Sequence, residues 1–127
     1  MALKRQDITV LERIHRLPDG LPVRLRLARA GDQRLLELLL ERLGVEASPL
    51  EVRRVLRYDP RRRVVVCASA LIGKTETLVG LGAVDLTDPD AEPDTLVFDR
   101  RLAPELGTLL RDGLRGRLSS RTRDSAA

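Results

Sequence analysis

Two kinds of hydrophobic spacing along the chain predict a mixture of helices and strands. Residues 23–28, VRLRLA, alternate apolar side chains with arginine, as in a strand with one solvent-exposed face. Residues 32–43 and 104–115 repeat leucine at helical spacing, and Gly44 stands where a left-handed helix cap is favoured. The spacing of apolar residues over 8–17 also predicts a short helix.

The middle of the chain predicts one more helix and then three strands. Ser48-Pro49-Leu50-Glu51 has the form of a capping box with proline at the first helical position, so we expect a helix over 49–57. Residues 63–70 are rich in β-branched side chains, and residues 77–86 carry glycines that disfavour a helix. Residues 95–99, TLVFD, predict a further short strand.

The length of 127 residues is that of one domain, and a hydrophobic content of 43% is enough for a core. We expect an N-terminal helix and turn over 1–20, a single domain over 21–117 and a disordered Arg/Ser tail over 118–127. No apolar run approaches the roughly 18–20 residues of a membrane span. Because the N-terminus also lacks a hydrophobic signal region, we expect a cytoplasmic protein.

Composition and charge narrow the classes of function. The net charge is +4, nearly all positive side chains are arginine, and leucine and alanine abound, which is typical of a bacterial protein from a GC-rich genome. Aromatic residues make up only 2% of the chain, which argues against nucleic-acid binding through stacked bases. A single cysteine, Cys67, excludes an internal disulfide and cannot build a metal site alone.

The stretch Ala68–Thr75, ASALIGKT, fits a relaxed form of the nucleotide-binding P-loop. However, no glycine lies between Ala68 and Gly73, and the residues after Thr75 predict a strand where a P-loop needs a helix. A hairpin turn at Gly73 is therefore the preferred interpretation, with nucleotide binding as a remote alternative.

The predicted order of strand, helix, helix, hairpin, strand and helix resembles the N-terminal half of the GCN5-related N-acyltransferase (GNAT) fold. Residues 23–44 resemble its first strand and helix, and residues 63–86 resemble its hairpin, including Val79-Gly80-Leu81-Gly82. Residues 96–110 resemble its fourth strand and the acyl-CoA loop. The resemblance implies a truncated α+β sandwich, with a mainly antiparallel sheet of about four strands, flanking helices and an extra N-terminal helix.

The family resemblance implies an acyl-CoA-dependent N-acetyltransferase whose cofactor is acetyl-CoA or another acyl-CoA. In the family, the backbone of the fourth strand pairs with the pantetheine arm, and the next loop wraps the pyrophosphate with amide N–H groups. Asp99 at the end of that strand is then a candidate general base, although a strand-end aspartate that starts a turn is the preferred alternative. The implied cofactor-binding residues are Val97, Phe98, Leu106, Gly107 and Thr108.

The sequence departs from the family pattern in two places. In the loop over 102–108 only Gly107 matches a glycine of the pattern, while Pro104 lacks an N–H group and Glu105 adds negative charge. In addition, the sequence after the helix at 104–115 does not predict the later strands of the family. Two functions therefore stay open, an acetyltransferase and a non-catalytic interaction or regulatory module that needs no cofactor.

The predicted strand at 96–98 suggests a surface for a partner. If this strand is the last in the sheet, one of its sides presents unpaired N–H and C=O groups that invite another chain. A homodimer across this edge is favoured, with a heteromer or coverage by the helix at 8–17 as alternatives. Tyr58 is interpreted as a packing residue at a helix end, and His15 as exposed to solvent.

Overall fold

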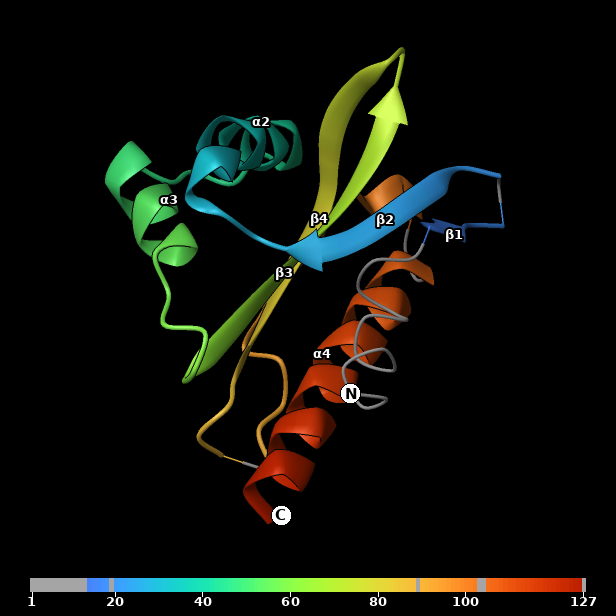
Figure 1. Ribbon diagram of the computed structural model, residues 1–127. Coiled ribbons are helices and arrows are strands. Elements are labelled where there is room, and N and C mark those ends of the chain that lie inside the picture. Colours follow the sequence, from blue (N-terminus) through green and yellow to red (C-terminus); the bar gives the residue numbers. More distant parts are fainter. Residues whose placement is uncertain (1–13, 19, 89, 103–104, 127) are drawn as a thin grey trace.

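The computed structural model describes residues 14–18, 20–88, 90–102 and 105–126. These residues form an α+β fold in which three α-helices flank a five-stranded antiparallel sheet of order β1-β2-β3-β4-β5 (Figure 1). The strands are β1 (Ile14–Arg16), β2 (Pro22–Leu27), β3 (Arg63–Ile72), β4 (Thr75–Asp85) and β5 (Thr95–Phe98). The helices are α2 (Gln33–Leu43), α3 (Pro49–Leu56) and α4 (Glu105–Ala126), with 3-10 turns η1 (Ala30–Asp32) and η2 (Arg100–Leu102).

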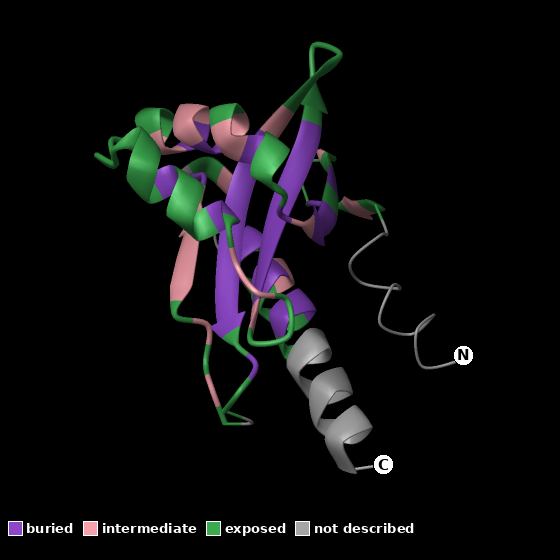
Figure 2. Ribbon diagram, turned by 60° about the vertical axis from the view of Figure 1, so that its left-hand side comes forward, coloured by how far each residue is buried: buried purple, intermediate pink, exposed green. Residues whose placement is uncertain are grey.

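The sheet lies between two layers of helix and has a hydrophobic core on each face (Figure 1). Helix α4 packs with β2, β3 and β4 in one core, whereas α2 and α3 pack on β3 and β4 in the other. Because both faces of these two central strands are covered, residues 64–70 of β3 and 78–84 of β4 are buried without alternation (Figure 2). This arrangement confirms the predicted sandwich of sheet and helices.

The predicted ends of α2 and α3 are confirmed by their caps. Gly44 adopts the left-handed conformation after α2, with a φ of 70°. Ser48 accepts a hydrogen bond from the Glu51 N–H (3.2 Å), and Pro49 opens α3 as expected. The predicted boundaries therefore follow from local chemistry.

Strands β3 and β4 form the hairpin that the sequence predicts at Gly73. Gly73 and Lys74 have φ values of 60° and 69°, so both turn residues lie in the left-handed region that suits a two-residue hairpin loop. The ladder runs from the pair Ile72 and Thr75 to the pair Arg63 and Asp85. A strand follows Thr75, where a P-loop would need a helix.

The prediction of a helix at 8–17 is wrong for residues 14–17, the part that the structure describes. Ile14–Arg16 is strand β1, which pairs with β2 in the register Ile14 to Arg24, and it raises the strand count from the expected four to five. The turn that ends with Gly20, which has a φ of 92°, reverses the chain and places these residues beside β2. They pair with the edge of β2 that does not face β3. The rest of this predicted helix lies outside the described residues.

Helix α4 begins where the sequence predicts and continues to Ala126, beyond the predicted end at 115. Its described backbone is thus helical over most of the segment 118–127, for which the sequence predicts a disordered tail; residue 127 lies outside the described part. In its first turns Leu106, Leu110 and Leu114 are fully buried, as their spacing predicts. Over the described ranges, no helix has the length and hydrophobicity needed to cross a membrane.

Two glycines of β4 let α4 approach the sheet closely. A Cβ atom added to Gly80 would lie 2.9 Å from Cδ1 of Leu110, and one added to Gly82 would lie 2.9 Å from Cδ1 of Leu114. Because these contacts are shorter than real Cβ contacts, α4 or its leucine side chains would have to move.

We therefore expect Gly80→Ala to lower the free energy of unfolding by about 1–3 kcal/mol, the usual effect of overpacking a core. Gly31→Ala is the control, because a Cβ atom there meets no atom within 4 Å. That variant should unfold at the same urea concentration as the wild type or slightly higher. Urea unfolding followed by circular dichroism measures both, and equal stabilities would contradict the close approach of α4.

Candidate functional site

The structure packs two of the predicted cofactor residues, Phe98 and Gly107, against each other and places the other three in different surroundings. Gly107 is buried in the first turn of α4, and a Cβ atom added there would lie 3.1 Å from Cζ of Phe98. Leu106 is fully buried in the core, while Thr108 is exposed on the outside of α4. Val97 points to the other face of the sheet and packs on the core under α2 and α3. Binding of an acyl-CoA pyrophosphate by these residues stays a prediction.

The candidate general base, Asp99, is engaged in a turn. Its carboxylate accepts hydrogen bonds from the Arg101 backbone N–H (3.0 Å) and guanidinium (2.9 Å), and its own N–H donates to the Val79 carbonyl oxygen (2.9 Å). The hydrogen bond from the Arg101 side chain lowers the pKa of Asp99 below its usual range. A general base works best with a pKa near the working pH. The lowered pKa of Asp99 therefore fits a structural role in the turn better than the role of a general base.

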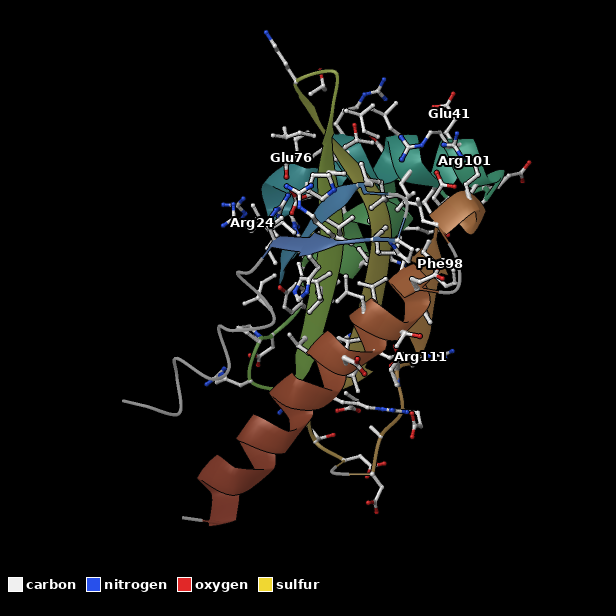
Figure 3. All side chains as sticks on the ribbon, turned by 90° about the vertical axis from the view of Figure 1, so that its right-hand side faces the viewer. Arg24, Glu41, Glu76, Phe98, Arg101 and Arg111 are labelled. Atoms are coloured by element: carbon white, nitrogen blue, oxygen red, sulfur yellow. The ribbon has the colours of Figure 1, made fainter. Side chains whose placement is uncertain are left out.

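A cavity of about 790 Å³ lies beside β2, and no local pattern in the sequence predicts it. Residues from β1, β2, β3, β4 and the end of α3 line it, and most of its wall is apolar. Figure 3 shows Arg24 and Glu76 of this cavity together, well apart from Phe98 and Arg101 near the predicted site. Its polar lining consists of Arg24, Arg26, Arg29, Tyr58, Ser69 and Glu76.

Arg26 is the buried charge of this cavity. It is only 6% exposed and binds the Asp32 carboxylate with two hydrogen bonds of 2.8 and 2.7 Å, in the bidentate geometry that arginine favours. Its guanidinium also donates to Glu76 (2.8 Å), a residue 50 positions further along the chain. The sequence predicts a solvent-exposed face for Arg24 and Arg26, which is wrong for Arg26.

The ion pair keeps both buried partners charged. Burial alone would raise the pKa of Asp32, but hydrogen bonds from the Arg26 side chain and the Arg29 N–H (2.7 Å) more than offset it and hold this pKa below its usual range. The hydrogen bond to Asp32 likewise raises the pKa of Arg26 against the opposing effect of burial. The network is thus a fixed, charged wall of the cavity.

Tyr58 fixes the chain after α3 against β2 and β3. Its hydroxyl donates to the Ala28 carbonyl oxygen (2.7 Å), and the Val65 carbonyl oxygen lies within 3.4 Å. These contacts agree with its prediction as a packing residue near a helix end. His15 instead lies on β1 opposite Val23, not on a helix.

Among the described residues, neither Cys67 nor a cluster of metal-ligating side chains forms a reactive centre. Cys67 is fully buried, and burial raises its pKa to about 12, so it is an inert core residue. Within the described ranges, no three His, Cys, Asp or Glu side chains are placed to hold a metal ion. The chain matches no family model and no curated protein. The β5 edge and the cavity are therefore the features of the described residues that bear on function.

We expect Asp32→Asn to lower the free energy of unfolding by about 3 kcal/mol, because it leaves the buried Arg26 charge without its main partner. Asp59→Asn is the control, because Asp59 pairs with an 82% exposed Arg61 and such a solvent-exposed pair contributes little to stability. Urea unfolding measures both, and equal losses would contradict a structural role for the buried pair.

Urea unfolding at a series of pH values tests the protonation state of Asp32. Since the pKa of Asp32 is lowered in the folded protein, its contribution is complete above the unfolded pKa of about 4 and is lost as the pH falls further. The stability difference between wild type and Asp32→Asn should therefore shrink below about pH 4.

Proposed function

We propose that this chain is a non-catalytic interaction module with a GNAT-like arrangement, and that it acts as a homodimer joined at β5. The order β2, α2, α3, β3, β4, β5 and α4 is the element order on which the family resemblance rests. The Phe98 ring packed on Gly107 and the turn at Asp99 support a role without acyl transfer. Within the described residues β5 lies at an edge of the sheet and pairs with β4 alone, and this observation carries the dimer.

The backbone of β5 sets which groups face the open edge. The Asp99 N–H donates to Val79 of β4, and hydrogen-bonding direction alternates along an antiparallel strand. Val97 therefore directs its N–H and C=O groups toward β4, whereas Leu96 and Phe98 direct theirs away from the sheet. Such outward groups are a template for pairing with another strand.

A two-fold axis perpendicular to the sheet gives these groups matching partners. With the axis at Val97, Leu96 of one copy lies opposite Phe98 of the other, and the outward N–H and C=O groups of both residues can pair. Leu96 and Phe98 also share the face that packs on α4, so each pair places two apolar side chains in contact. The edge is thus complementary to itself in one register.

We expect the wild-type protein to be a dimer at high micromolar concentration, and Leu96→Pro to weaken it at least about tenfold. The proline removes one outward N–H from each copy, and each hydrogen bond contributes about 1 kcal/mol. Leu96→Ala is the matched control, because it shortens the side chain but keeps the N–H. Size-exclusion chromatography with light scattering measures the dimer, and circular dichroism checks the fold.

A monomeric wild type at that concentration would contradict the proposal. If Leu96→Ala dissociates the dimer as fully as Leu96→Pro, the backbone pairing is not what joins the two copies.

Acyl-CoA binding would use the same outward backbone groups, because the family resemblance implies that they pair with the pantetheine arm. We expect calorimetric titration with acetyl-CoA to give no binding up to millimolar ligand. Micromolar binding that Leu96→Pro abolishes and Leu96→Ala retains would instead support the acetyltransferase.

A further inference from the structure

The cavity beside β2 has the size and the apolar wall of a small-molecule site. Its volume of about 790 Å³ falls within the roughly 300–1,000 Å³ that is typical of such sites. Leu56 of α3 contributes to the wall, while Ile14 and Leu71, at 65% and 68% exposure, leave apolar surface open to solvent at the margin. An aliphatic ligand in the cavity would cover this surface.

Ser69 is a buried polar residue of the cavity whose hydroxyl lacks a protein partner. The residue is only 7% exposed, and it lines the cavity on the same face of β3 as Leu71. Within the part of the chain that the structure describes, its hydroxyl makes no hydrogen bond. Every fully enclosed side-chain N or O atom of that part has a partner, so the Ser69 oxygen is accessible from the cavity. Since buried hydroxyls are normally hydrogen-bonded, a ligand atom at this place would supply the missing partner.

The charges around the cavity indicate that this ligand atom is neutral. Arg26, the buried charge of the lining, is already held by the carboxylates of Asp32 and Glu76. A charged group taken out of water needs a counter-charge, and the buried one is engaged. A serine hydroxyl can both donate and accept a hydrogen bond, so it suits a neutral hydroxyl or carbonyl group.

We propose that this cavity binds a small uncharged aliphatic molecule whose hydroxyl or carbonyl oxygen is hydrogen-bonded to Ser69 and whose hydrocarbon part lies along Leu56 and Leu71. The site is formed by side chains and lies apart from the β5 edge (Figure 3). It is therefore independent of the proposed dimer, whose backbone pairing is measured separately.

Tyr58 gives the site its own reporter. It lines the cavity, it is the only tyrosine, and the chain has no tryptophan. A titration of the full-length protein with 1-octanol should change the tyrosine fluorescence to saturation at sub-millimolar concentration. Octanoate and octyltrimethylammonium, with the same chain length and opposite charges, should each bind at least about tenfold more weakly, because each would bury a charge.

Removal of the hydroxyl tests the polar end of the site. Ser69→Ala should weaken 1-octanol binding about fivefold, the effect of losing one neutral hydrogen bond. Thr77→Ala is the matched control, because it removes a hydroxyl from the neighbouring strand that does not line the cavity, and it should leave binding unchanged. Circular dichroism checks that both variants fold.

Two neighbouring residues of β3 test the apolar end. Leu71→Ala should weaken binding at least about threefold, because it removes apolar surface that the ligand covers. Ile72→Ala is the control, since this residue is also exposed, at 51%, but lies on the opposite face of the strand and does not line the cavity.

Three results would overturn the proposal. The first is no saturable fluorescence change with 1-octanol up to millimolar concentration. The second is binding of either charged analogue as tightly as 1-octanol, which would show that the site does not select a neutral group. The third is an unchanged affinity in Ser69→Ala, or an equal loss in Leu71→Ala and Ile72→Ala, which would indicate adsorption to the surface without use of this cavity.

Discussion

Burial of both faces of the β3–β4 hairpin is the constraint on which the rest of the structure depends. Helix α4 covers one face and approaches closely because Gly80 and Gly82 carry no Cβ atom, while α2 and α3 cover the other. Both faces of the central strands are therefore buried in the core. Among the described residues, the outer edge of β5 and the face of β2 beside the cavity remain open at the periphery of the sheet.

These two open regions would recognise partners through different kinds of interaction. The β5 edge offers backbone groups, which select a strand of suitable length and direction with little regard for its side chains. The cavity offers an apolar wall with a few polar groups, which selects shape and polarity. A module with both could join a second copy and sense a small ligand without any catalytic group.

The buried Arg26–Asp32 pair shows how tertiary structure changes the meaning of a residue. An arginine between Leu25 and Leu27 in a strand indicates a solvent-exposed position, and Arg24 is exposed. At Arg26 the η1 turn brings Asp32 back to the same place, and Glu76 arrives from the hairpin. The first partner lies six residues away in sequence, whereas no local pattern predicts the second.

The sequence by itself determined the elements whose causes are local. Leucine spacing and the caps at Gly44 and Ser48 specify the helices, and Gly73 specifies the hairpin, because these depend on neighbours within a few residues. The tertiary structure decided the strand at Ile14–Arg16, the packing of Phe98 on Gly107 and the cavity beside β2. Each of these depends on a contact with a distant segment, and hydrophobic periodicity carries no information about which segment that is.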